Sequence, residues 1–147
     1  LHSMTTKDYL GQVQKLNKML QDRQSDLEEL EGIAESVSSM KYSKDLVISS
    51  GRQDRLENIV IRILEVEDDV SRLIDAYITK KNAIVTQIEA MDMDEYEVLR
   101  LRFIDCKPFK EIHEKLDDRY GCSERHVYRL YNKALNNFER KYGSRYL

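Results

Sequence analysis

Three side chains spaced along one predicted helix have the chemistry to recognise base pairs. Arg125, Arg129 and Asn132 follow one another at intervals of four and three residues, so they share one face of an α-helix. An arginine guanidinium donates two hydrogen bonds to O6 and N7 of guanine, and an asparagine amide pairs in a similar bidentate way with adenine. These residues are therefore candidates for contacts to bases in the major groove of double-stranded DNA.

Polar side chains around this face suit contacts to the DNA backbone. The residues predicted to touch phosphates or groove walls are Ser123, His126, Tyr128, Lys133 and Lys110. Such contacts position a protein on the duplex but carry no sequence information. The same composition is also typical of an ordinary solvated helix face, and for Lys110 surface charge is an equally good explanation.

Two helices joined by a tight turn are predicted to position these residues. The first covers about Phe109–Tyr120, and the second begins after Ser123 and extends to about Tyr142. Gly121-Cys122-Ser123 forms the turn, with a glycine suited to end one helix and a serine suited to cap the next. The second helix has an apolar face formed by Val127, Leu130, Tyr131, Ala134 and Phe138. This pattern predicts a helix-turn-helix, whose second helix enters the major groove.

A third short helix is predicted just before this pair, over Asp94–Ile104. Val98, Leu99 and Phe103 give it an apolar face. Asp92 and Glu95 have the spacing of a capping box at its start. Together the three helices form a predicted domain over residues 92–147.

Residues 94–138 resemble region 4 of bacterial sigma factors. The matching pieces are Val98-Leu99-Arg100-Leu101-Arg102-Phe103, Lys110-Glu111-Ile112, Ser123-Glu124-Arg125-His126-Val127 and Ala134-Leu135. With the N-terminal helices and Asp54-Arg55-Leu56 included, the chain resembles the RinA and ArpU type of late-gene activators from phages of Gram-positive bacteria. The resemblance implies a transcriptional regulator of phage or prophage origin, with promoter contacts at Arg125, Tyr128 and Arg129. Together with the turn and the preceding helix, the resemblance favours base contacts over a solvated face. The chain departs from the sigma pattern at Asp117-Asp118-Arg119-Tyr120, which lengthens the helix before Gly121 by about one turn.

Residues 4–91 are predicted to form an antiparallel coiled-coil hairpin, so the fold class is all-α. One helix covers about Thr6–Val37 and the other about Gly51–Met91, with a loop at about residues 38–50. Apolar residues repeat with the heptad spacing along both helices. Arg23 interrupts the first seam, and Lys80 and Gln87 are polar positions in the second. One partner helix cannot cover the long apolar face of the second helix, which suggests that either the C-terminal module or a second copy of the chain covers the rest. A homodimer through this hairpin is predicted, because one recognition helix with two or three base contacts discriminates poorly alone.

Charge is distributed unevenly along the chain. The formal net charge is −3, yet residues 95–147 carry 12 Lys and Arg against 9 Asp and Glu, a net charge of +3. Residues 1–94 therefore carry a net charge of −6. Attraction to phosphate is predicted to be concentrated in the C-terminal part.

Composition argues against several other classes of protein. There is no apolar run of the length that spans a bilayer and no signal-peptide pattern, and Leu1-His2-Ser3 before Met4 resembles a cloning remnant. Cys106 and Cys122 lack partners at metal-ligand spacing, which favours reduced thiols in a cytoplasmic protein. No phosphate loop, metal cluster or nucleophile–base pair indicates an enzyme, and no cofactor or small-molecule substrate is expected.

These observations predict a sequence-specific DNA-binding transcriptional regulator, with two alternatives. One is the DNA-recognition subunit of a phage packaging complex, which also combines such a motif with an oligomerising coil, although usually in the opposite order. The other is a coiled-coil interaction protein that binds RNA polymerase. A large ring of subunits would favour the first alternative, and absence of salt-sensitive binding to duplex DNA would favour the second.

Overall fold

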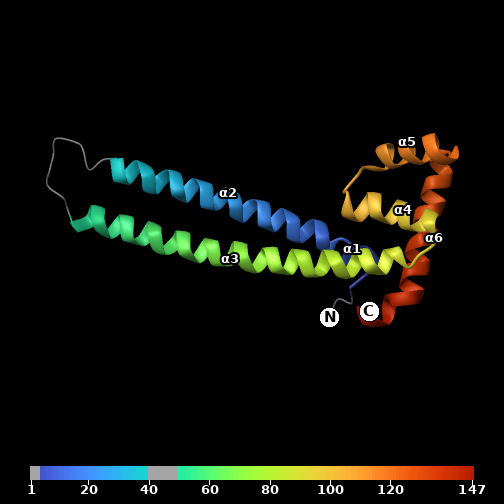
Figure 1. Cartoon of the computed structure of the whole chain (residues 1–147), viewed down its shortest axis with the longest axis horizontal. Coiled ribbons are helices and arrows are strands. Elements are labelled where there is room, and N and C mark those ends of the chain that lie inside the picture. The colour runs from blue at the N-terminus through green and yellow to red at the C-terminus, as the bar shows by residue number, and fades with distance from the viewer. Residues whose placement is uncertain (1–3, 40–49) are drawn as a thin grey trace. The chain divides into compact units, whose positions relative to one another are not determined.

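The computed structural model describes residues 4–39 and 50–147 of the 147-residue chain. Within these residues every regular element is a helix and no β-strand occurs, so the all-α fold class is confirmed. The elements are α1 (Thr6–Leu10), α2 (Gln12–Ser39), α3 (Ser50–Glu89), α4 (Met93–Leu99), η2 (Arg100–Ile104), α5 (Phe109–Tyr120), α6 (Glu124–Tyr142) and η3 (Gly143–Arg145) (Figure 1). The suggested cloning remnant at residues 1–3 and most of the predicted loop, residues 40–49, lie outside the described residues.

The first predicted helix is interrupted near its start. The sequence predicts one helix from Thr6 to Val37, but α1 ends at Leu10 and α2 begins at Gln12. Gly11 lies between them, and a Cβ atom added there would come within 2.9 Å of the carbonyl oxygen of Lys7. Since real Cβ contacts are essentially never that short, the backbone can turn this tightly only because residue 11 is glycine.

The described residues form two compact units. Unit 1 combines the chain up to Leu16 with Tyr77–Leu147, and unit 2 is Asn17–Ala76. This division differs from the boundary at residues 91/92 that the sequence predicts. Unit 1 includes α1 and the last part of α3, because their apolar residues join the same core as α4, α5 and α6.

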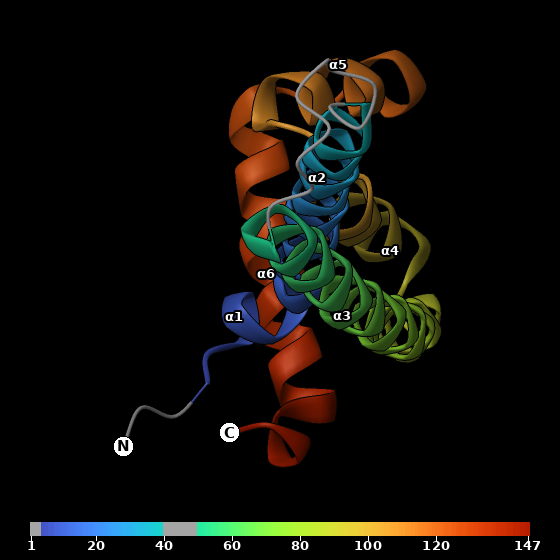
Figure 2. The same ribbon diagram turned by 90° about the vertical axis from the view of Figure 1, so that its left-hand side faces the viewer.

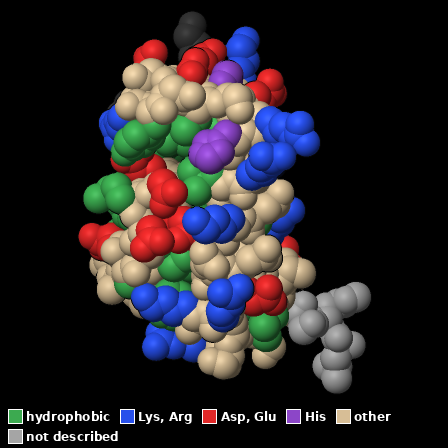
Figure 3. Space-filling view, turned by 90° about the vertical axis from the view of Figure 1, so that its right-hand side faces the viewer, with side chains coloured by type: hydrophobic (Ala, Val, Ile, Leu, Met, Phe, Trp, Pro, Cys, Tyr) green, Lys and Arg blue, Asp and Glu red, His purple; other side chains and the backbone are tan. Residues whose placement is uncertain are grey.

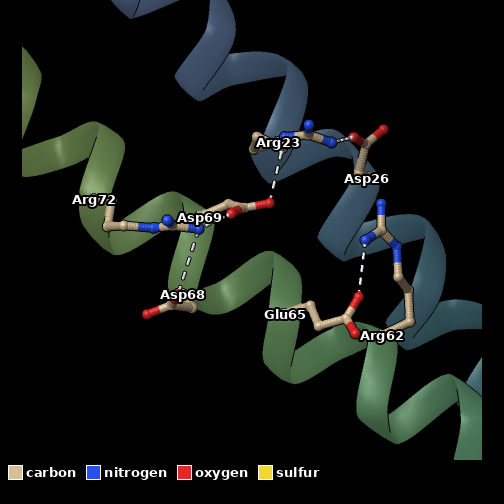
Figure 4. A network of polar contacts seen from close by, with 7 residues as sticks. All are labelled: Arg23, Asp26, Arg62, Glu65, Asp68, Asp69 and Arg72. Atoms are coloured by element: carbon tan, nitrogen blue, oxygen red, sulfur yellow. Dashed lines mark hydrogen bonds and ion pairs between the residues drawn. The ribbon is translucent and has the colours of Figure 1, made fainter.

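Unit 2 consists of parts of α2 and α3 that lie side by side and run in opposite directions (Figures 1 and 2). Val37 and Val66 are its buried apolar side chains, 7% and 0% exposed. Arg23, the predicted interruption of the seam, pairs with carboxylates of both helices: its Nη1 lies 3.2 Å from Asp26 Oδ2, and its Nε lies 3.9 Å from Asp69 Oδ2 (Figure 4). Exposed ion pairs of this kind contribute only about 0–1 kcal/mol each, so they add little to the stability of unit 2.

The described part of unit 1 has an apolar core built from side chains of α1, α2, α3, α4, η2, α5 and α6. Its completely buried side chains come from segments far apart in the sequence: Leu10, Ile84, Val98, Leu99, Ile112, Ala134 and Phe138 are all 0% exposed. Helix α1 lies against α6, as Figure 2 shows. Phe138 of α6 has its ring centroid 6.0 Å from that of Tyr9. The N-terminal helix is therefore part of the core that supports α6.

Tyr9 connects α1 to both α3 and the C-terminal segment. Its hydroxyl donates a hydrogen bond to Gln87 Oε1 at 2.7 Å, and its ring stacks on Tyr146 with centroids 4.3 Å apart. Lys80 Nζ lies 5.5 Å from the centroid of the same ring. The two polar seam positions of the second helix, Lys80 and Gln87, thus both contact Tyr9.

The helix predicted over Asp94–Ile104 changes type part-way. α4 ends at Leu99 and continues as the π-helical turn η2, in which the amide of Asp105 donates to the carbonyl of Arg100. Val98, Leu99 and Phe103 point into the core as predicted. The predicted capping box is wrong: the Asp92 side chain makes no capping hydrogen bond, and Glu95 is buried inside unit 1.

Candidate nucleic-acid interface

The connection between α5 and α6 is short and has a defined backbone geometry. α5 ends at Tyr120, and Gly121 follows in the left-handed region with φ 67° and ψ 33°. The Gly121 amide donates to the carbonyl of Asp117 at 2.8 Å. Ser123 then caps α6, since its Oγ accepts a hydrogen bond from the amide of His126 at 3.2 Å. These contacts end one helix and begin the next within three residues.

α6 has one buried and one exposed face. The buried side chains are Val127, Leu130, Tyr131, Ala134, Leu135, Phe138 and Tyr142. On the opposite side, the residues predicted to contact DNA from α6 and its cap are all exposed: Ser123, Arg125, His126, Tyr128, Arg129, Asn132 and Lys133. Lys110, the predicted phosphate contact outside α6, is exposed on the first turn of α5.

Arg125, Arg129 and Asn132 form a row along α6. From the first to the third the helix rises about 10 Å, which is close to the length of three base pairs. Among the residues that the structure describes, none of the three side chains has a hydrogen-bond or ion-pair partner. Their donors and acceptors are therefore available to another molecule without breaking an internal contact.

Tyr128 combines exposure with packing. Tyr128 is 42% exposed, and the centroid of its ring lies 4.7 Å from that of Phe109 at the start of α5. Phe109 also meets the edge of Tyr131 at 4.9 Å, and the guanidinium of Arg102 lies 4.3 Å from the Phe109 ring. This aromatic group attaches the start of α5 to the middle of α6, so the Tyr128 ring is held in place on the predicted interface.

Tyr131 occupies the buried side of the same aromatic group. Burial raises the pKa of its hydroxyl, and the nearby Arg102 offsets only part of this effect. Arg102 Nη1 also donates a hydrogen bond to the carbonyl of Lys107 at 3.1 Å, which holds the segment before α5. The sequence offered no local signal for these roles of Arg102.

A buried carboxylate joins α4 to α6. Glu95 is 2% exposed, and its Oε2 accepts a hydrogen bond from Asn137 Nδ2 at 2.6 Å. Asn137 lies one residue beyond Asn136 and points toward α4 instead of the exposed face. Buried polar groups need such partners, because an unmade hydrogen bond there costs about 1–3 kcal/mol. Sequence reasoning assigned no role to Asn137.

A second carboxylate of α4 contacts the end of α5. Glu97 Oε1 accepts hydrogen bonds from Arg119 Nη1 at 2.8 Å and from the Tyr120 hydroxyl at 2.9 Å. The bond to Glu97 is the main reason that the pKa values of both Arg119 and Tyr120 are raised above their usual values. The last two residues of α5 thus both bind α4.

Carboxylates also gather at the start of α4. Within the described residues, Asp92, Asp94 and Glu95 have oxygens within 4.8 Å of one another. Two of these residues are exposed, and Glu95 is already bonded to Asn137. This arrangement is explained by the helix start and the buried pair, and it does not indicate a metal site.

The surface around α6 carries charges of both signs. Figure 3 shows one face of the molecule, on which both Lys and Arg side chains and Asp and Glu side chains occur. Residues 123–147 carry 6 Lys and Arg against 2 Asp and Glu. The net charge of this segment would therefore attract a polyanion.

One family model matches a large part of the chain. The family model described as "Protein of unknown function (DUF1492)" matches residues 36–139, more than half of the chain. The chain belongs to the DUF1492 family. The region matched to DUF1492 contains α3, α4, η2, α5 and the part of α6 that bears Arg125, Arg129 and Asn132. No curated protein and no solved structure matches the chain.

No helix among the described residues has both the length and the apolar character needed to cross a membrane.

Proposed function

We propose that this chain is a sequence-specific double-stranded DNA-binding transcriptional regulator. In this proposal α5, the turn at Gly121 and α6 act as a helix-turn-helix similar to sigma region 4, and α6 enters the major groove. The observation that carries the proposal is the exposed row of Arg125, Arg129 and Asn132, whose side chains have no internal partner in the described part of the chain. The opposite side of the same helix is buried, which fixes the direction in which the row points.

The proposed contacts divide by chemistry. Arg125 and Arg129, near the start of α6, are assigned to bases with Asn132 as a third contact, because N-terminal residues of a recognition helix reach base edges first. Backbone or groove-wall contacts are assigned to Ser123, His126, Tyr128, Lys133 and Lys110. The Ser123 oxygen accepts from the helix, but its hydroxyl hydrogen is still free to be donated to a phosphate.

The biological setting follows from the resemblance to late-gene activators. We infer a phage or prophage origin and a role in the bacterial cytoplasm, with activation of late genes as the expected outcome. Contact with RNA polymerase through the acidic N-terminal hairpin, residues 4–91, is compatible with this role.

Dimerisation through the antiparallel hairpin is part of the proposal. Unit 2 leaves Val60, Ile61 and Leu64 of α3 exposed by 46%, 54% and 59%. Three neighbouring apolar side chains in water favour burial against another surface. A second copy of the chain is the favoured partner, because one recognition helix with two or three base contacts discriminates weakly and pairing doubles the site.

The test is selection of bound duplexes from a random DNA pool, at two salt concentrations. The variant Arg125→Ala/Arg129→Ala is compared with Arg62→Ala/Arg72→Ala, which removes the same charge from unit 2. The wild type and the control are expected to enrich one sequence, and the α6 variant is expected to lose at least tenfold in affinity for it, since each bidentate contact supplies about 1–3 kcal/mol. Equal loss in both variants, or no enrichment by folded wild type, would refute base recognition by α6.

Light scattering on the same samples addresses the alternatives. A dimer that Leu64→Lys converts to a monomer supports the transcriptional proposal. A ring of many subunits would favour the packaging subunit. Failure to bind duplex DNA at either salt concentration would favour the polymerase-binding protein.

A further inference from the structure

The last turn of α5 is held in place by one side chain of α4. Glu97 accepts hydrogen bonds from Arg119 and Tyr120, which are 22 and 23 residues away in sequence and are the final two residues of α5. The Glu97 side chain is only 14% exposed, whereas that of Arg119 is 65% exposed. The acceptor is thus fixed among packed helices, and the two donors reach it from the surface.

The contact between Glu97 and the end of α5 restrains the last turn of that helix. The last carbonyl groups of a helix lack intrahelical partners, so the final turn tends to fray. Here the final turn is attached to α4 by two hydrogen bonds to an ionised carboxylate, which are stronger than neutral ones. Gly121 follows directly, so the attachment determines where α5 ends and where the connection to α6 begins.

The attachment involves the turn of α5 that leads directly into the connection. α5 continues through Asp117-Asp118-Arg119-Tyr120 before Gly121. Without a tertiary contact, this last turn would fray more easily and would loosen the connection between the two helices. The two residues that complete this turn are the ones that bind Glu97.

We propose that Glu97 is a positioning residue for DNA binding. Together with Arg119 and Tyr120 it forms an α5 clamp, which holds the end of α5 so that α6 presents Arg125 and Arg129 to the duplex in one orientation. The role of the clamp in DNA binding rests on the proposed function, whereas the contact itself does not.

The charge of Glu97 and its role in the clamp predict opposite changes in DNA affinity when its carboxylate is removed. If the carboxylate acted only through its charge, removing it would strengthen binding to a polyanion. If it acts through the clamp, removing it weakens binding, because the loosened turn must be ordered again in the complex. The sign of the change in affinity therefore separates the two explanations.

The variants are Glu97→Ala, Glu97→Gln and Tyr120→Phe, with Asp118→Ala as control. Glu97→Gln keeps one accepting oxygen without the charge, and Tyr120→Phe removes one hydrogen bond with no change in charge. Asp118 is an exposed carboxylate on the same turn of α5 and has no part in the clamp. Each protein is examined by amide hydrogen exchange at residues 119–121 and by binding of duplex DNA at two salt concentrations.

For Glu97→Ala we expect faster exchange at residues 119–121 by about tenfold or more, because this variant lacks both hydrogen bonds of the clamp. Its affinity for DNA should fall by a few fold, with the same dependence on salt as in the wild type. Glu97→Gln should recover most of both properties, Tyr120→Phe should be intermediate, and Asp118→Ala should show neither change.

Two results would overturn the inference in different ways. Unchanged exchange in Glu97→Ala would show that no clamp exists. Faster exchange with equal or tighter DNA binding would show a clamp that does not position α6. If the wild type binds no DNA, the proposed function and the positioning role both fail, while the exchange data still decide whether the clamp is present.

Discussion

Leu10→Ala is predicted to weaken α6 although the two lie at opposite ends of the sequence. Leu10 is 0% exposed and belongs to the same core as Phe138 and Ile84. The substitution removes about three methylene equivalents, worth about 0.8 kcal/mol each in transfer free energy. The cavity left behind adds to this, since Leu→Ala changes at buried sites cost about 2.7–5.0 kcal/mol. We expect the free energy of unfolding of unit 1 to fall by about 3 kcal/mol.

Native-state hydrogen exchange measures this loss of stability at individual amides. Amides in the middle of α6, such as those of Ala134 and Leu135, should exchange on the order of 100-fold faster in Leu10→Ala, because every 1.4 kcal/mol is a factor of ten. Ile33→Ala is the matched control: residue 33 is 42% exposed in unit 2, and this substitution should leave exchange in α6 unchanged. If α6 exchanged at the wild-type rate in Leu10→Ala, α1 would not belong to the core that supports α6.

Three further predictions concern single groups in unit 1. Gly121→Ala should lower the free energy of unfolding by about 1 kcal/mol in urea titration, because φ is 67° there and a Cβ disfavours the left-handed region; no loss would contradict this backbone geometry. Asn137→Ala should cost about 1.5–3 kcal/mol by leaving the buried Glu95 carboxylate without its donor, and a cost below 0.5 kcal/mol would show that water replaces the amide. Burial raises the pKa of Tyr131 above 10.0, so its contribution to stability is present below pH 10 and is lost as the pH rises through the folded-state pKa; Tyr131→Phe should make the alkaline fall in stability shallower, and an identical pH profile would argue against this group.

Local signals in the sequence were sufficient for the ends of α5 and α6. Gly121 adopts the left-handed conformation that ends α5, and Ser123 caps the start of α6. The predicted limits of the two helices at Tyr120 and Ser123 therefore agree with the structure. The apolar repeat likewise predicted which side of α6 is buried. Helix ends and the buried face of a helix depend on residues that are close together in the sequence. A single sequence is therefore enough to predict them.

Contacts between distant residues were not predictable in the same way. Nothing near Tyr9 indicates that it bonds Gln87, and nothing near Glu97 indicates that Arg119 and Tyr120 bind it. The capping box at Asp92 failed for this reason: Glu95 has the right spacing for a local role, but the tertiary bond to Asn137 and burial in the core outweigh it. The break at Gly11 was missed because a glycine near the end of a predicted helix weakens that helix least and so gave no reason to interrupt it.

Unit 1 is assembled from the beginning and the end of the chain, and this constrains when it can fold. Thr6 Oγ1 and the Tyr146 hydroxyl are 2.8 Å apart but 140 residues apart in sequence. During synthesis α1 emerges from the ribosome long before α6, the helix that it packs against. Until then its apolar side chains remain exposed to water or are bound by a chaperone. Contacts of such high sequence separation slow folding, whereas unit 2 can form from adjacent segments alone. A chain whose synthesis stops before α6 would therefore contain unit 2 but lack the helix that carries Arg125, Arg129 and Asn132. Such a truncated product would lack the proposed DNA-binding surface.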